Sequence, residues 1–285
     1  MTGIEEIRLM LANLDISVIA MLLAIGLCTG FLAGLLGIGG GMVLVPCLVF
    51  ILEKQGVTGA LTIKMAIATA MATILFTSIS SVWAHHRRGA IRWDIVRGLV
   101  PGIVGGGLLA GAGAFALLKG QTLGLFFSAF VGYSAWRMFK GRAKETSVRQ
   151  DVHGFSGLIA VGVGIGFISG LVGAGGGFLS VPYMTRCNVP IHKAIATSAA
   201  LGFPIAAANV LGYVISGWNL ERIVVGGWGY FYLPALVLMV VCSIVTAPIG
   251  AKVAHGMDVA ALKKVFALLL AVLAFYMLYK STLGV

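Results

Sequence analysis

The chain has 285 residues, of which 59% are hydrophobic and 10% charged, and its mean hydropathy is +1.03. Because so few polar residues cannot cover a water-soluble globule, the composition predicts an all-α polytopic membrane protein. The formal net charge of +11 lies mostly in short loops, where Lys and Arg fix membrane orientation, so it gives no indication of nucleic-acid binding.

Apolar runs predict ten membrane segments, five in each half of the chain. They cover 16–36, 41–52, 61–84, 98–118 and 121–139, and then 154–173, 176–188, 194–216, 228–251 and 259–280. The first run follows a leader of mixed charge, so we interpret it as a transmembrane helix rather than a signal peptide. Two segments, 41–52 and 176–188, are short for a full crossing, which predicts eight full helices and two half-helices.

The two halves repeat each other. GFLAGLLGIGGGMVLVP (30–46) and GFISGLVGAGGGFLSVP (166–182) match at 10 of 17 positions, and AIAT occurs at 66–69 and again at 194–197. These matches predict a single membrane domain made of two homologous repeats, 1–140 and 154–285, joined by a cytoplasmic linker over 141–153.

Five segments per repeat would invert the second repeat relative to the first. The positive-inside rule then assigns 14 Lys and Arg residues to the cytoplasm and six to the outside. If each glycine triplet only kinks one crossing, eight segments remain and the split is 12 to eight, so the charges favour inversion. The cytoplasmic residues of the ten-segment topology are Arg87, Arg88, Arg92, Arg97, Arg137, Lys140, Arg142, Lys144, Arg149, Arg186, Lys193, Lys252, Lys263 and Lys264.

Each repeat contains a glycine triplet that should interrupt its first helix. A helix break in hydrocarbon leaves backbone groups unpaired unless protein buries it or it lines a polar cavity, and paired breaks are typical of transporters with inverted repeats. We therefore expect two half-helix N-termini to bind an anion, with Pro46 and Pro182 near their first turns. The triplets are Gly39, Gly40 and Gly41, and Gly175, Gly176 and Gly177.

Other glycines are expected to serve helix packing only, as small residues commonly do in membranes. These are Gly102, Gly105, Gly106, Gly107, Gly111 and Gly113. Close helix packing is also the alternative interpretation of the two triplets.

The helices that follow supply neutral polar groups for a substrate. Hydroxyl residues recur every fourth position from Thr69 through Thr73 and Thr77 to Ser81, and the second half offers Thr197, Ser198 and Asn209. Such hydroxyls can bind an oxyanion, or they can simply bond the carbonyl four residues earlier in their own helix. We take Thr69, Thr197, Ser198 and Asn209 as substrate-binding candidates.

Charged groups are expected at the ends of these helices. Lys64, His192 and Lys193 lie at the helix mouths, where they could attract anions or act as interfacial anchors. His85 and His86 begin a basic turn and are expected to be solvated.

The sequence contains no motif for an enzyme, a metal site or a cofactor. Four scattered cysteines, Cys28, Cys47, Cys187 and Cys242, are interpreted as packing residues, with contact to a sulfur-containing solute as the alternative.

The GxxxGxxGxGGG pattern, the valine and proline that follow it, and the AxAT segments resemble the TauE/SafE sulfite-exporter family, also called the toluenesulfonate uptake permease family. The resemblance covers nearly the whole chain and implies about eight transmembrane helices and transport of sulfite, sulfonates or related anions. The positions that match the family motif are Gly37, Gly39, Gly40, Gly41, Pro46 and Thr69, with Gly173, Gly175, Gly176, Gly177, Pro182 and Thr197. Ser198 has no counterpart because Ala70 occupies the equivalent position.

These observations together predict a secondary transporter that exports small sulfur-containing anions by alternating access. The expected location is the bacterial inner membrane, with the lipid bilayer as solvent, protons as the candidate coupling ion and a homodimer as the candidate assembly. The alternatives are a passive anion channel and a non-transporting membrane subunit in sulfur metabolism.

Overall fold

A computed structural model describes residues 14–37, 40–140, 154–220, 224–254 and 259–283 of the chain. The first half contains α2 (Ile16–Leu36), α3 (Gly41–Lys54), α4 (Ala60–His86), α5 (Trp93–Leu108), a π-helical turn (Leu109–Ala114), α6 (Phe115–Leu117) and α7 (Gly120–Lys140). The second half contains α8 (Phe155–Val172), α9 (Gly177–Arg186), α10 (Ile191–Gly217), α11 (Leu233–Ala254) and α12 (Val259–Leu283). A short antiparallel hairpin of β1 (Gly227–Trp228) and β2 (Phe231–Tyr232) precedes α11.

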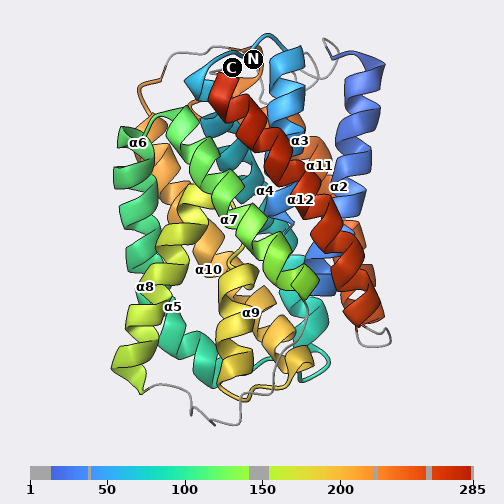
Figure 1. Ribbon diagram of the computed structural model, residues 1–285, viewed down its shortest axis with the longest axis vertical. Coiled ribbons are helices and arrows are strands. Elements are labelled where there is room, and N and C mark those ends of the chain that lie inside the picture. Colours follow the sequence, from blue (N-terminus) through green and yellow to red (C-terminus); the bar gives the residue numbers. More distant parts are fainter. Residues whose placement is uncertain (1–13, 38–39, 141–153, 221–223, 255–258, 284–285) are drawn as a thin grey trace, which may run out of the picture.

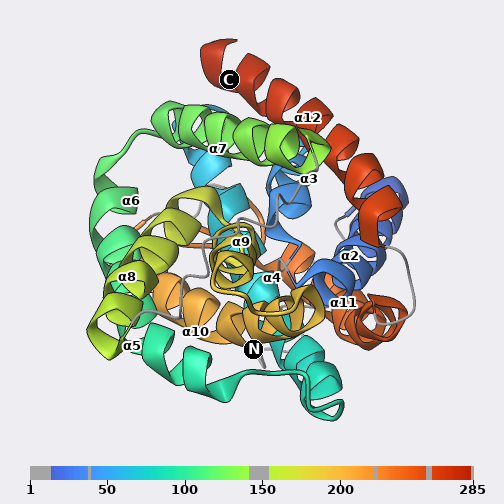
Figure 2. The same ribbon diagram turned by 60° about the horizontal axis from the view of Figure 1, so that its bottom comes forward.

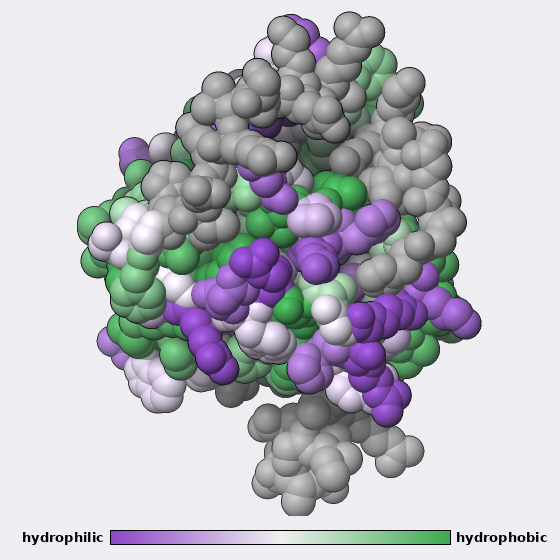
Figure 3. All heavy atoms as spheres, turned by 90° about the horizontal axis from the view of Figure 1, so that it is seen from below, coloured by the Kyte–Doolittle hydropathy of each residue, from purple (hydrophilic) through white to green (hydrophobic). Residues whose placement is uncertain are grey.

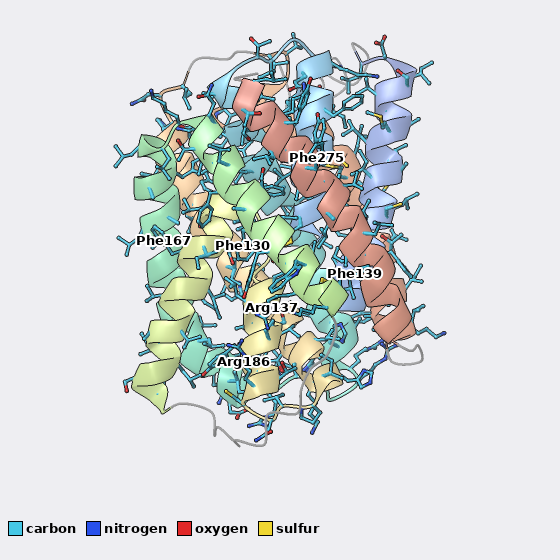
Figure 4. The ribbon with its side chains drawn as sticks, in the orientation of Figure 1. Phe130, Arg137, Phe139, Phe167, Arg186 and Phe275 are labelled. Carbon is cyan, nitrogen blue, oxygen red and sulfur yellow. The ribbon has the colours of Figure 1, made fainter. Side chains whose placement is uncertain are left out.

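The prediction of an all-α membrane protein is confirmed. Seven helical spans in the described residues are long and apolar enough to cross a bilayer, one fewer than the eight full helices expected. α7 has 21 residues but is not among the seven. Large apolar side chains face outward along the bundle, such as Phe275, which is 73% exposed (Figure 4), as expected for a surface that contacts lipid.

Two helices form the centre of the bundle. In α4 and α10, 72% of the residues of the most apolar stretch are buried, compared with 33–44% in the other spans. These two helices carry the AIAT segments. In Figure 2 the short helix α9 also lies near the centre, beside α4, and the longer helices α2, α5, α7, α8, α11 and α12 lie toward the outside. The residues proposed for substrate binding on α4 and α10 therefore lie in the core of the molecule.

The two halves are interleaved. α2 packs along α11, α8 along α5, α7 along α12, and α4 along α10, so each of these contacts joins one half to the other. Equivalent elements run in opposite directions: α2 descends and α8 ascends in Figure 1, as do α4 and α10.

Glycines make the contacts between the halves close. Gly26, Gly30 and Gly34 form one face of α2, and a Cβ on any of them would overlap the backbone of α11 between Met239 and Ala251. Gly102 and Gly106 of α5 contact the carbonyl oxygens of Ile159 and Val163 in the same way, which is the packing predicted for them. Gly105 and Gly113 differ from the prediction, because no atom lies within 4 Å of a Cβ placed on either residue.

Two predicted segment boundaries are wrong. The helix expected from residue 228 begins at Leu233, because Gly226 and Gly229 adopt left-handed φ angles of 83° and 54° and residues 227–232 form the hairpin. The helix expected from residue 98 begins at Trp93, five residues earlier.

Basic residues mark one end of the bundle, seen from below in Figure 3, where hydrophilic side chains gather. We call this the basic end. At this end lie the helix termini with the basic residues Arg87, Arg88, Arg92, Arg97, Arg137, Lys140, Arg186, His192, Lys193 and Lys252. Every side chain that the ten-segment topology assigns to the cytoplasm, and that the structure describes, lies at this end.

Candidate functional site

Both glycine motifs interrupt a helix with the same backbone geometry. α2 ends at Gly37, which has a φ of 65°, and α3 begins after Gly40, with a φ of 69°. In the second half the equivalent angles are 70° at Gly173 and 76° at Gly176. Side chains with a Cβ rarely adopt these left-handed angles, so the helix breaks require glycine. Gly39 lies outside the described residues.

The two interruptions meet in the interior of the bundle. A Cβ on Gly41 would overlap the carbonyl oxygen of Gly173, and a Cβ on Gly37 would overlap the carbonyl oxygen of Ile195 in α10. α3 and α9 therefore both start beside this contact and extend away from it toward opposite ends (Figure 1). The contact therefore involves the first residue of α3 and lies four residues before the first residue of α9. The first N–H groups of each of these helices have no partner within the helix.

The prolines lie further along the half-helices than predicted. Pro46 and Pro182 are inside α3 and α9, five residues after the first helical residues Gly41 and Gly177. At this position a proline cannot donate the helical hydrogen bond to the carbonyl four residues earlier, which is that of Met42 in α3 and Phe178 in α9. The expectation that the missing N–H lies near the first turn is therefore wrong.

A buried hydrogen-bonded chain connects the two interruptions. Ser180 of α9 donates to the Ser198 hydroxyl over 2.8 Å, and Ser198 donates to the carbonyl oxygen of Gly37 over 2.8 Å. Both serines are fully buried. In the first repeat the equivalent positions hold Leu44 and Ala70, so this polar chain belongs to the second repeat alone. Ser180 was not among the predicted site residues, although its replacement of an aligned leucine was a visible signal.

Thr69 and Thr197 make equivalent contacts with the opposite halves. The Thr69 hydroxyl accepts a hydrogen bond from the backbone N–H of Tyr232 at 3.0 Å, just before α11. The Thr197 hydroxyl accepts one from the N–H of Arg92 at 3.0 Å, just before α5. Both threonines are fully buried, so their hydroxyls fix the start of a helix in the other repeat.

The other hydroxyls of the predicted stripe on α4, those of Thr73, Thr77 and Ser81, divide into two groups. Thr73 and Thr77 donate to the carbonyls of Thr69 and Thr73 in the preceding turn, which is the alternative interpretation of the stripe. The Thr77 hydroxyl also shares a 2.6 Å hydrogen bond with the Ser243 hydroxyl of α11. The Ser81 hydroxyl is buried without a hydrogen-bond partner. It lines a cavity between α2, α4 and α10 that is bounded by Ala33, Gly37, Ser78, Ser81, Ala199 and Gly202. The cavity is about large enough for a single water molecule.

Asn209 is buried against other parts of the bundle. Its amide nitrogen donates to the carbonyls of Ile205 at 2.8 Å and Gly166 at 3.3 Å, while its amide oxygen is buried without a partner. A Cβ on Gly170 would overlap that oxygen. Asn209 is not among the residues that line the cavity, so the structure separates it from Ser81, its equivalent in the first repeat.

The charged residues at the helix mouths have contrasting environments. His192 and Lys193 are exposed at the basic end, at the start of α10. Lys64 is only 9% exposed; its amine donates to the carbonyl of Ala116 at 3.0 Å and lies 5.7 Å from the ring centres of Phe115 and Tyr230. Lys64 therefore lies near the start of α4, as predicted for a helix mouth, but its side chain is buried there.

His85 also differs from its prediction. Its side chain is fully buried, and Nε2 lies 3.2 Å from the carbonyl oxygen of Gly34 in α2. The next residue, His86, is exposed as expected. The four cysteines are free thiols, and Cys187 is the buried one.

The fold and these interrupted helices define a polytopic helical membrane protein, and its relatives are described as transporters. A "Probable membrane transporter protein" of Haemophilus influenzae is 35% identical over 262 residues, which cover 92% of this chain and 98% of the relative. One from Methanocaldococcus jannaschii is 27% identical over 90% of this chain and 94% of the relative. No solved structure matches the chain.

The sequence model of the Sulfite exporter TauE/SafE family matches residues 22–277. The chain belongs to this family, as the glycine motifs predict, and is a multi-pass membrane transporter.

Proposed function

We propose that the protein is a secondary transporter of small sulfur-containing anions such as sulfite or sulfonates. The observation that carries the proposal is the contact between the two helix interruptions in the interior, where α3 begins and α8 ends, beside the cavity that Gly37 and Ser81 line. Each N-terminus is equivalent to roughly half a positive charge, so the pair offers about one unit without burying a cationic side chain. This matches a monovalent anion, such as a sulfonate group or hydrogensulfite.

The oxygens of a sulfite or sulfonate group accept several hydrogen bonds at once. The first N–H groups of α3 and α9 can supply some of them, and the hydroxyls of Ser81 and Ser198 can supply others. Ser81 has no partner to lose, whereas Ser198 would exchange its bond to Gly37 for one to the substrate. Neutral donors of this kind replace the water around an anion at low cost in a medium where a buried charge is expensive.

Alternating access is supported by the relation between the repeats. Equivalent helices run in opposite directions, and the helices of each half pack on those of the other, as expected for an inverted repeat. The cavity holds about one water molecule, so a sulfonate requires the two interruptions to move apart. The glycines at the ends of α2 and α8 are suitable hinges because their backbone is unrestricted by a Cβ.

Flux measurements in proteoliposomes test this proposal. The vesicles would contain sulfite, sulfoacetate, taurine, thiosulfate, sulfate or chloride, with and without an imposed proton gradient. We expect saturable flux of a sulfur-containing anion that its analogues inhibit. Linear, unselective flux would favour an anion channel instead, and absence of flux for every anion would contradict the proposal.

A further inference from the structure

His85 is a buried ionisable group at the basic end of the first repeat. It lies in the last turn of α4, and the three residues that follow it, His86, Arg87 and Arg88, are all exposed. Its side chain has no exposed surface because α2 covers it at Gly34, whose carbonyl oxygen lies 3.2 Å from Nε2.

The position of His85 places it next to the cavity beside Gly37. Ser81, which lines the cavity, lies four residues earlier on α4, so the two side chains are neighbours on one helix face. Ala33, which also lines the cavity, directly precedes the Gly34 that contacts His85. His85 therefore lies one helical turn from the cavity, between it and the basic end.

The other ionisable groups around this end are exposed to solvent. The described ones are His86, Arg87 and Arg88 on α4, Lys252 on α11, His192 and Lys193 on α10, Arg186 on α9, Arg137 and Lys140 on α7, and Asp94 and Arg97 on α5. Arg92, before α5, is partly buried and paired with Asp94 through a 2.5 Å contact. Helix α2, which covers His85, contains no acidic or basic side chain. Within the described structure, His85 is the one ionisable side chain at this end that is fully buried.

The second repeat has a side chain of different chemistry at the equivalent position. Tyr213 follows the second AIAT segment at the same spacing as His85 follows the first, and its hydroxyl donates to the carbonyl of Gly170, the equivalent of Gly34. A histidine titrates near neutral pH, whereas a buried phenol stays neutral there. Of these two equivalent side chains, only His85 in the first repeat can therefore gain a proton near neutral pH.

We infer that His85 binds a proton together with the transported anion. The inference rests on the proposed function, since it assigns a counter-charge to the same cavity. A protonated imidazole one turn from the anion offsets part of the cost of burying a negative charge. Binding of the two is reciprocal: a proton on His85 strengthens anion binding, and a bound anion strengthens proton binding.

The sign of the pH dependence follows directly. The imidazole is protonated at low pH, so the anion binds tightly there, and KM rises as the pH increases through the range of the histidine. With one linked proton the rise is at most about tenfold per pH unit.

The test uses a sulfonate that the wild-type protein transports, because a sulfonate stays ionised at every pH used. KM for this anion would be measured in proteoliposomes from pH 5.5 to 8 for the wild type, His85→Tyr, His85→Gln and His86→Gln. His85→Tyr reproduces the chemistry of Tyr213 and keeps a donor toward Gly34. His86→Gln is the matched control, since it changes the exposed neighbour.

We expect KM to rise with pH in the wild type and in His86→Gln, and to be high and independent of pH in both His85 variants. A wild-type KM that does not change with pH would overturn the inference without reference to any variant, as would an unchanged pH profile in folded His85→Gln. Absence of saturable flux in the wild type at every pH would instead contradict the proposed function.

Discussion

Gly41 shows how one missing methyl group lets the two interrupted helices meet. Its Cα lies against the carbonyl oxygen of Gly173, a backbone atom that cannot move without displacing the second interruption. Other glycines, such as Gly105, lie in open space. The loss of stability expected on adding a Cβ therefore differs widely between glycines of this chain.

We predict that Gly41→Ala destabilises the protein by about 1–3 kcal/mol or more, because overpacking against backbone cannot be relieved by a rotamer change. Thermal unfolding in detergent would measure the loss, and flux in proteoliposomes should fall with it. Gly105→Ala is the control: it should be neutral, or stabilising by up to about 1 kcal/mol, because alanine favours a helix over glycine. Equal stability of the two variants would contradict the interpretation.

The Ser198 hydroxyl of α10 is hydrogen-bonded to Ser180 of α9 and to the carbonyl of Gly37. Removal of this hydroxyl should therefore weaken the contacts among all three elements. Ser198→Ala leaves the Ser180 hydroxyl and the Gly37 carbonyl without this partner, at an expected cost of about 1–3 kcal/mol. Alanine itself should fit, since Ala70 occupies the equivalent position in the first repeat.

A double-mutant cycle with Ser180→Ala separates the hydrogen-bonded chain from simple packing. If the chain exists, Ser180→Ala costs stability in the wild-type background and much less in the Ser198→Ala background. Strictly additive unfolding free energies would show that the two serines act independently.

At the scale of elements, the starts of α5 and α11 depend on threonines in the other half of the molecule. The hydroxyl of Thr69 accepts a hydrogen bond from the backbone N–H of Tyr232, at the end of the β hairpin. The Tyr232 phenol has a pKa raised by burial to about 12, so this residue remains neutral at physiological pH and the contact is governed by hydrogen bonding and packing.

We predict that Thr69→Val loosens the hairpin, because the buried Tyr232 N–H loses its acceptor at a cost of about 1–3 kcal/mol. Hydrogen exchange followed by mass spectrometry should show faster exchange in a peptide that covers 227–233. Thr73→Val is the matched control, because the Thr73 hydroxyl bonds only a carbonyl of its own helix. Unchanged exchange in Thr69→Val would rule out this role.

At the scale of the whole molecule, charge separates the two ends. The hairpin end of the bundle carries Lys54, Lys64, Lys119 and Lys280 among its described residues. The basic end carries more than twice as many cationic side chains, so the positive-inside rule predicts that it faces the cytoplasm.

This sidedness predicts the labelling of single cysteines in a chain whose four native cysteines are replaced. A cysteine at Val225, which is 68% exposed beside the hairpin, should react in intact cells with a maleimide that does not cross membranes. A cysteine at the exposed Arg87 should react only after permeabilisation. The reverse pattern would mean that the orientation is opposite, and external labelling at both positions would contradict the topology.

The sequence by itself determined the membrane class, nearly every helix and the two glycine interruptions. These properties depend on neighbouring residues in the sequence. Apolar runs of bilayer length define the membrane spans, and glycines that adopt left-handed φ angles, such as Gly37 and Gly173, end the helices. The family likewise followed from short motifs. The hairpin before α11 was missed because its apolar residues read as the start of the next helix.

Only the tertiary structure decided which groups meet. Ser198 and Gly37 are 161 residues apart, and Thr69 and Tyr232 are 163 apart, so no pattern within one repeat reveals these bonds. His85 looked solvated because a basic turn follows it, and Lys64 was expected only to lie at a helix mouth, with no indication that it would be covered. Both are buried because elements distant in sequence, α2 over His85 and α6 with Tyr230 over Lys64, cover them. Burial depends on packing between segments, and the periodicity of a single helix carries no information about its neighbours.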